Sequence, residues 1–147
     1  MFYDDFKIGD SFVTRGRTVT EADIVAFAGL SGDFNSLHVD AEYGKTTPFG
    51  QRIAHGLLVL SISSGLTVQT GLTSDSIIAF YGIDKLRFVK PVFIGDTLTV
   101  SNRVIELTPK EDPTRGLVVF ETTVVKQSQE PVLVYHRRVL LRRKANS

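Results

Sequence analysis

The fold of this chain is decided by residues 53–70, which read IAHGLLVLSISSGLTVQT. No formally charged side chain occurs between Arg52 and Asp75, and large aliphatic residues are mixed with glycine and serine. A membrane span is one interpretation, since the uncharged length would suffice. The clustered serines and threonines leave the segment less apolar than a usual span, so we favour a buried helix. Its small residues indicate close packing against a sheet.

After this helix the chain changes to segments rich in β-branched and aromatic residues, which are typical of strands. The predicted strands are 77–81, 85–89, 96–107, 117–126 and 132–143. Turn-forming residues at 95–96, 109–116 and 127–131 favour an antiparallel meander. Residues 6–13 predict a turn that enters one more strand. One central helix against such a sheet predicts an α+β architecture in a single domain, residues 1–147.

A helix with an N-cap at Thr20 is predicted to lead into residues 31–38, SGDFNSLH. This short link places an acid, an amide and an imidazole close together, at Asp33, Asn35 and His38. Irregular links between helices often carry binding and catalytic residues. Taken alone, Asp33 and Asn35 are better explained as turn formers, and His38 as a structural histidine.

A second segment strengthens the functional interpretation. Gly56 opens the buried helix, where unpaired backbone N–H groups and the helix dipole favour a developing negative charge. An acid, an imidazole and such an oxyanion site together suit thioester enolate chemistry. His55 adjoins this glycine and has two interpretations, a wall of the site or a histidine bonded to backbone at the helix start.

Residues 27–38, FAGLSGDFNSLH, resemble the signature of the MaoC-like dehydratases, the (R)-specific enoyl-CoA hydratases. Residues 53–66 resemble the central helix of that family, and residues 88–97, FVKPVFIGDT, resemble its strand-turn-strand segment. The similarity therefore runs over most of the chain. The family commonly has proline where this chain has Ser36, a departure that removes no reacting group.

The resemblance implies a hot-dog fold, in which a strongly curved antiparallel sheet wraps a long central helix. It also implies a homodimer with an acyl-CoA tunnel near the subunit interface, and a hydratase of fatty acid metabolism. By the same resemblance, Asp33 and His38 hold the reacting water and exchange protons, Asn35 positions the loop, and the Gly56 N–H binds the thioester oxygen. Ser64 is similar to a serine that helps to orient the aspartate, with Ser61 and Ser63 as nearby alternatives.

Two other functions stay open on the sequence. A hot-dog thioesterase often carries an acid on its central helix, and no acid occurs between Ile53 and Thr70. A non-catalytic acyl-thioester binding subunit would keep the tunnel, but the presence of both proton-transfer residues argues against it. The acyl group, the choice between CoA and a carrier-protein thioester, and the division of the two proton transfers are undetermined.

Composition excludes some classes of partner and site. The formal net charge of +1 gives no broad reason to expect nucleic acid or an acidic membrane surface. A basic run near the end is interpreted as a solvated strand edge and tail, with local contact to CoA phosphates as the alternative. It comprises Arg137, Arg138, Arg142, Arg143 and Lys144.

Cysteine is absent, and the three histidines are scattered along the sequence. We therefore expect no metal site and no cofactor. His136 has no acid partner visible in the sequence and is interpreted as a structural or surface residue. The first residues lack the basic start and apolar core of a secretory signal, which favours the cytoplasm.

Overall fold

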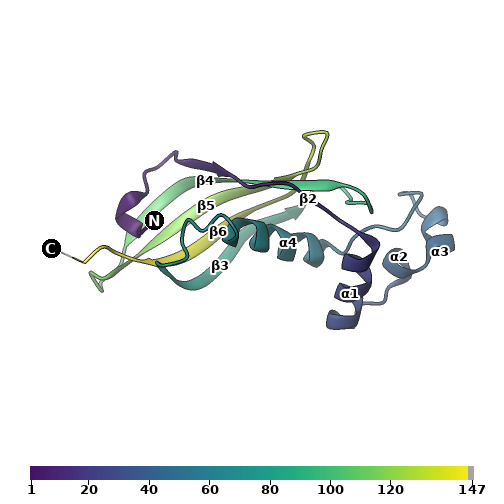
Figure 1. Cartoon of the computed structure of the whole chain (residues 1–147), viewed down its shortest axis with the longest axis horizontal. Coiled ribbons are helices and arrows are strands. Elements are labelled where there is room, and N and C mark those ends of the chain that lie inside the picture. The colour runs from purple at the N-terminus through teal and green to yellow at the C-terminus, as the bar shows by residue number, and fades with distance from the viewer. Residues whose placement is uncertain (146–147) are drawn as a thin grey trace.

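The computed structural model describes residues 1–145, and its secondary structure matches the predicted α+β class (Figure 1). The N-terminal part contains η1 (Tyr3–Asp5), β1 (Ser11–Val13), β2 (Arg17–Thr18), α1 (Glu21–Ser31), α2 (Ser36–Val39) and α3 (Ala41–Thr46). The central helix and the long strands follow as α4 (Gly56–Val68), β3 (Ile77–Phe88), β4 (Thr97–Pro109), β5 (Arg115–Val125) and β6 (Pro131–Arg142).

The strands form an antiparallel sheet in the order β1-β4-β5-β6-β3, with β2 also paired to β4. Strands β4, β5 and β6 follow one another as the predicted meander. The meander is wrong for β3, which pairs with β6 so that Phe80 lies opposite Val139. The chain reaches this position because α4 crosses the sheet before β3 begins, and β3 then occupies the free edge of β6 (Figure 1).

Residues 77–81 and 85–89, predicted as two strands, form the single strand β3 up to Phe88. The pairing with β6 continues through Gly82, Ile83 and Asp84, so the expected break does not occur. Register shifts interrupt the ladder, and Lys85 has a left-handed backbone with φ of 53°. Such irregularities increase the local twist, which lets one long strand follow a curved sheet.

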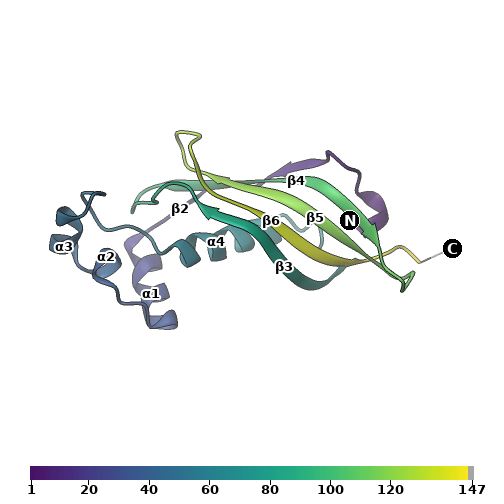
Figure 2. The same cartoon turned by 180° about the vertical axis from the view of Figure 1, so that it is seen from behind.

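The predicted buried helix is α4, which lies along one face of the sheet in both views (Figures 1 and 2). It begins at Gly56, three residues after the start of the predicted segment. Its apolar face joins residues of α1, the long strands and the connecting loops in the main core. That core comprises Val19, Ile24, Ala54, Leu58, Val59, Ile62, Leu66, Val92, Leu98, Val100, Val124, Val132, Leu133 and Tyr135. None of the helices formed by residues 1–145 combines the length and apolarity needed to cross a bilayer.

Helix α1 begins and ends as the sequence predicts. The Thr20 hydroxyl accepts a hydrogen bond from the Asp23 N–H, and the Asp23 carboxylate accepts one from the Thr20 N–H. This reciprocal capping box satisfies two donors at the helix start. Gly32 ends the helix in the left-handed conformation with φ of 78°, which glycine adopts without a steric penalty. The residues that follow are thereby aimed away from the helix axis.

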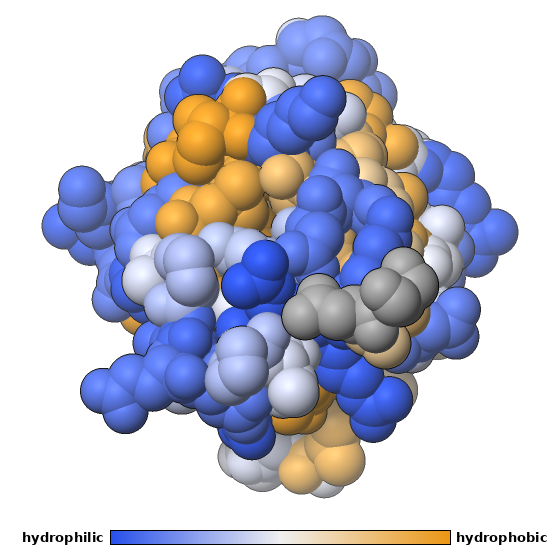
Figure 3. Space-filling view, turned by 90° about the vertical axis from the view of Figure 1, so that its left-hand side faces the viewer, coloured by the Kyte–Doolittle hydropathy of each residue, from blue (hydrophilic) through white to orange (hydrophobic). Residues whose placement is uncertain are grey.

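The basic run does not behave as one solvated patch. Arg143 donates to Asp4 over 2.7 and 2.9 Å, Lys144 pairs with Asp5, and Arg138 pairs with Asp84 at 3.0 Å. Hydrophilic residues cover most of the end that carries the chain termini, with hydrophobic residues gathered toward its upper part (Figure 3). Arg137 is buried, so the prediction of a solvated position is wrong for this residue.

A second apolar cluster lies beneath the N-terminal segment and contains Tyr3, Phe6, Val104, Val118, Phe120, Val139 and Leu141. Gly116 on β5 makes this packing feasible. A methyl group at Gly116 would come within 2.4 to 2.6 Å of the Tyr3 ring. The glycine therefore lets the aromatic ring of η1 lie directly on the sheet.

We predict that Gly116→Ala lowers the free energy of unfolding by about 1–3 kcal/mol, because the methyl group overpacks the contact with Tyr3. Gly29→Ala is the matched control, since no heavy atom outside the local chain lies within 4 Å of its added methyl group. Alanine inside helix α1 should be neutral or stabilising by up to about 1 kcal/mol. Urea unfolding of both purified variants measures the difference. Equal stability of the two variants would contradict the proposed role of Gly116.

Candidate active site

The link between α1 and α2 is shaped by its own side chains. The Asp33 carboxylate accepts a hydrogen bond from the Asn35 N–H at 3.2 Å. The Asn35 amide oxygen accepts one from the Leu37 N–H at 3.0 Å and caps α2. Asp33 and Asn35 are thus turn formers, as one interpretation predicts. The same turns also present His38, on α2, to the Asp33 carboxylate.

One ring nitrogen of His38 is hydrogen-bonded to backbone, and the other is directed at the Asp33 carboxylate. Its Nδ1 lies 2.7 Å from the carbonyl oxygen of Ile53, and a carbonyl oxygen only accepts, so Nδ1 carries a proton. In the neutral ring Nε2 is then unprotonated. This Nε2 lies 3.9 Å from Asp33 Oδ2, beyond a direct hydrogen bond. The ring is nearly buried, whereas half of the Asp33 side chain is exposed.

His55 lies beside these residues, and it is bonded to backbone, as one of its two interpretations predicts. Its Nε2 donates to the backbone oxygen of Asp33 at 2.9 Å, which ties the loop to the start of α4. Its ring stacks on that of His38 with centroids 3.8 Å apart and contacts Phe27 edge-on at 4.9 Å. Its Nδ1 is buried without a partner among residues 1–145.

Two of the three histidines, His38 and His55, are distant in sequence but adjacent in space. Asp33, His38 and His55 each offer one ligand atom, and these atoms lie within 4.8 Å of one another. They are the described residues best placed to hold a metal ion. His136 lies apart from them on β6, where its Nε2 is 3.9 Å from Glu121, an acid partner that the sequence did not reveal.

Gly56 is the first residue of α4, so its N–H has no acceptor within the helix. A methyl group at this position would lie 2.6 Å from the Phe88 ring. The glycine therefore has a packing role that the sequence alone did not suggest, beside its predicted role near a ligand. Phe88 is 52% exposed, so its ring has room to move away.

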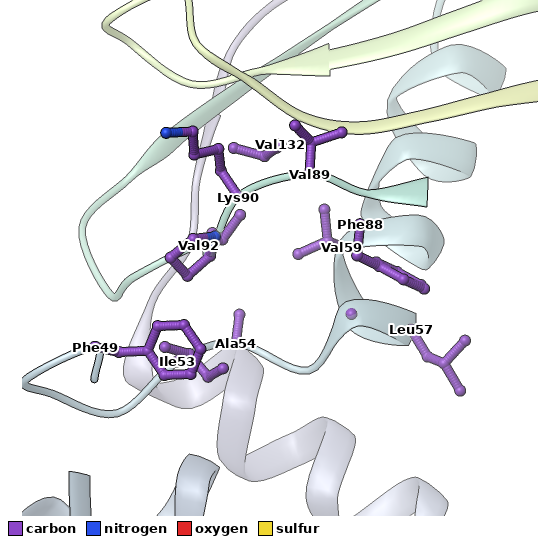
Figure 4. A pocket seen from close by; sticks show the side chains of 12 residues that line it. Phe49, Ile53, Ala54, Leu57, Val59, Phe88, Val89, Lys90, Val92 and Val132 are labelled. Carbon is purple, nitrogen blue, oxygen red and sulfur yellow. The ribbon is translucent and has the colours of Figure 1, made fainter. Parts of the chain in front are cut away.

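Gly56 also lines a cavity of about 470 Å³ (Figure 4). This volume lies within the range of small-molecule sites, roughly 300–1,000 Å³. The other lining residues are Phe49, Ile53, Ala54, Leu57, Val59, Phe88, Val89, Lys90, Pro91, Val92 and Val132. All but Lys90 are apolar, so the cavity suits an apolar group with a polar end at its rim.

The segment 88–97, identified from the sequence by resemblance alone, forms one wall of this cavity. Its turn is held by Asp96, whose carboxylate accepts hydrogen bonds from the Phe93 N–H and from the Gln127 amide, both at 2.8 Å. Burial by itself would raise the pKa of Asp96, but these hydrogen bonds and the charge of Lys126 lower it. The ionised carboxylate thus fixes the loop that follows Phe88.

Ser64 is not joined to Asp33 by a hydrogen bond in the described part of the chain. It lies eight residues beyond Gly56, about 12 Å along the helix axis. The nearby buried serine is Ser63, whose hydroxyl lies 2.8 Å from the Tyr135 hydroxyl, while Ser61 donates to the Leu57 carbonyl. The sequence did not single out Ile53, Phe27 or Phe88 as residues of the site, and no single-residue signal distinguishes them from core residues.

Comparison with known proteins identifies the family of this chain. The family described as the MaoC like domain matches residues 5–127. The (R)-specific enoyl-CoA hydratase of Rhodospirillum rubrum is 39% identical over 122 residues, which cover 83% of this chain and 79% of that protein. Protein MaoC of Klebsiella aerogenes is 43% identical over 99 residues, which cover 67% of this chain. The matched part is only 29% of that longer protein.

Solved structures agree as well. The MaoC-like dehydratase from Rhodospirillum rubrum superimposes with a TM-score of 0.90 at 30% identity, and the match covers 99% of both chains. A Mycobacterium tuberculosis protein with a double hotdog fold superimposes with a TM-score of 0.85 at 24% identity. This match covers 100% of this chain and 46% of that one. The latter similarity concerns the fold alone. Since the family match spans most of the chain and the sheet wraps one long helix, this chain belongs to the MaoC-like domain family and has the hot-dog fold.

Proposed function

We propose that this protein is a hydro-lyase that adds water to a trans-2-enoyl-CoA, giving an (R)-3-hydroxyacyl-CoA, and catalyses the reverse dehydration. The observation that carries the proposal is the 3.9 Å separation of Asp33 Oδ2 and His38 Nε2, next to the unpaired N–H groups of α4. The R. rubrum relative named (R)-specific enoyl-CoA hydratase supports this choice of reaction.

The reaction moves two protons and creates one oxyanion. The oxygen of water bonds to C3, one water proton passes to the enzyme, and a proton from the enzyme reaches C2. At a separation of 3.9 Å a water molecule bridges Asp33 and His38 more readily than they bond directly. In our working assignment, Asp33 takes the proton from water and protonated His38 delivers one to C2.

The tautomer of His38 constrains this assignment. Its Nδ1 proton is committed to the Ile53 carbonyl, so only Nε2 faces the reacting atoms. For His38 to donate, Nε2 must carry a second proton, so the ring must be an imidazolium. If the His38 ring is neutral, Nε2 takes the proton from water, and a protonated Asp33 donates its proton to C2. Both assignments balance the protons and use the same two residues.

The electron pair that leaves the double bond resides largely on the thioester oxygen before C2 is protonated. The Gly56 N–H, at the start of α4, is the donor proposed for this oxygen, and the helix dipole favours the same charge. The cavity beside Gly56 offers apolar walls for part of the thioester. His55 and Asn35 are proposed as positioning residues, because each holds the backbone of the Asp33 loop or of α2.

We also propose a homodimer joined along β3. This strand is an edge of the sheet, and its exposed apolar residues include Ile77, Ile78, Phe80, Tyr81 and Phe88. An edge with unpaired backbone groups and apolar side chains favours pairing with another strand. A second copy of the chain offers the same edge, which suits an isologous contact. Phe88 lies at one end of this edge and beside Gly56, so the contact would reach the site.

We predict that Asp33→Asn and His38→Gln each lower the rate of hydration by about 10²–10⁴-fold, because each removes one proton-exchanging group at constant size. The double variant should lose little more, since the two residues act as one unit. The decrease of the conjugated enoyl-thioester absorbance measures the rate, and chiral chromatography identifies the product. His136→Gln is the control and should keep normal activity. A folded single variant with nearly unchanged turnover would refute the assignment, and release of free CoA would indicate a thioesterase.

We predict that Gly56→Ala lowers hydration by about 10²–10³-fold, because the methyl group displaces the N–H donor or the thioester oxygen. The double variant Gly56→Ala/Phe88→Ala separates this effect from packing, since the smaller residue frees the space that the methyl group needs. We expect the double variant to regain thermal stability but not activity, after correction for Phe88→Ala alone. Recovery of activity together with stability would mean that the glycine serves only to accommodate Phe88.

We predict that Phe80→Lys weakens the dimer and lowers activity in parallel, because a charge on an edge strand opposes pairing. Val13→Lys is the matched control, since Val13 is also exposed and lies on β1, at the opposite edge of the sheet. Sedimentation and activity measured over the same dilution series test the coupling. A monomer with full activity would contradict the proposed contribution of the interface to the site.

A further inference from the structure

Arg137 is a buried cation that the proposed reaction does not use. It lies in the middle of β6, opposite Phe120 of β5 and Ile83 of β3, and its exposed fraction is 5%. Its side chain makes no hydrogen bond or ion pair with any residue of the described range 1–145, and its Nε is buried without a partner. Arginine donates hydrogen bonds and accepts none, so the buried Nε–H lacks an acceptor and the charge lacks a counter-charge.

The near neighbours of Arg137 do not supply a counter-charge. The Phe120 ring lies 5.0 Å from the guanidinium carbon, which gives a cation–π contact but no hydrogen-bond acceptor in the plane of the group. Burial lowers the pKa of Arg137, and Tyr135 is the one neighbour that opposes this effect. A carboxylate close enough to pair with Arg137 does not occur among residues 1–145.

Arg137 lines a small cavity between the N-terminal segment and the C-terminal end of α4. Its walls include Phe6 and Phe12 on one side, and Thr67 and Thr73 on the other. The centre of a water-sized sphere can move through about 10 Å³ of this cavity, so the hole is larger than one water molecule and holds a single small ion. Thr67 lies eleven residues beyond Gly56, about 16 Å along the helix axis, so this cavity is separate from the candidate active site.

The hydrogen-bonding groups of the cavity favour an acceptor as its occupant. The Thr67 hydroxyl already accepts from the Asn102 amide at 3.3 Å, and the Asn102 oxygen accepts from Thr122 at 2.8 Å. The Thr67 hydroxyl proton therefore still needs an acceptor. The Thr67 carbonyl is already used, because the Thr70 hydroxyl and the Thr70 N–H both donate to it. The Arg137 Nε–H and the Thr67 hydroxyl proton thus have no acceptor among the described residues, beside a positive charge.

We propose that this cavity binds a small monovalent anion of the size of chloride, with the Arg137 guanidinium as its main ligand and the Thr67 hydroxyl as a second donor. An anion satisfies several N–H donors at once and neutralises the buried charge. A water molecule also accepts hydrogen bonds, but it leaves that charge uncompensated. The bound anion would join β6 to the end of α4 and so stabilise the folded chain. This inference does not depend on the proposed hydratase reaction.

Thermal unfolding tests the proposal with chloride as the probe and gluconate, which is too large for the cavity, as the reference anion. Sodium concentration and ionic strength stay constant while chloride replaces gluconate. We expect the unfolding temperature of the wild-type protein to rise by about 4 °C for each tenfold increase in chloride concentration above the dissociation constant of chloride. Arg137→Met, which has similar length and no charge, should show no such rise. Arg138→Met is the matched control and should respond like the wild type, because Arg138 pairs with Asp84 outside the cavity.

Crystals of the wild-type protein grown with sodium bromide give a second readout that needs no variant. We expect an anomalous bromide peak within hydrogen-bonding distance of the Arg137 guanidinium. A water molecule there without halide signal would overturn the proposal. An equal chloride response of Arg137→Met and wild type would also overturn it. If Arg137→Met does not fold, the bromide position decides alone.

Discussion

Burial of α4 against a single curved sheet is the constraint on which the rest of this structure depends. A sheet face that carries long apolar strands must be covered, and here one helix with an apolar stripe covers it (Figure 2). The helix begins at the end of the sheet where α1, α2 and α3 lie, so its unpaired N–H groups face the segment that carries Asp33 and His38. The position of the site therefore follows from how the core is covered.

Two backbone carbonyls connect the reactive loop to this helix. His38 donates to the carbonyl of Ile53, just before α4, and His55 at the helix start donates to the carbonyl of Asp33. The two hydrogen bonds cross between the segments, and the histidine rings stack where they cross. Each imidazole is thereby held in one tautomer and one orientation, which a proton-transfer site requires.

The far end of α4 shows the cost of burying polar groups. Ser63 and Thr67 face polar residues of the sheet. The Ser63 hydroxyl pairs with the Tyr135 hydroxyl, and the Thr67 hydroxyl accepts from Asn102, whose oxygen accepts from Thr122. Arg137 continues this polar strip without a partner of its own. A mixed sequence of leucines and serines in the central helix thus has two structural causes, an apolar face toward the main core and a polar row toward the buried hydrogen bonds.

The sequence by itself determined the fold class, the buried helix, the capping box of α1 and the family. The first three features depend on local patterns: an uncharged apolar segment, a Thr20–Asp23 spacing, and runs of β-branched residues. The family followed from the resemblance of residues 27–38, 53–66 and 88–97 to its motifs. The loop from Asp33 to His38 was also identifiable, because its side chains form turns with their near neighbours in the chain.

Only the tertiary structure decided the pairing of β3 with β6, the stacking of His55 on His38, the contact of Phe88 with Gly56 and the burial of Arg137. Each of these brings together residues that are distant in sequence, and strand order and ring contacts leave no periodic signal in the chain. Arg137 illustrates the reason most clearly. Its basic neighbours in sequence suggested solvent, but the alternation of side chains along β6 turned it inward, and the fold of the N-terminal segment closed over it.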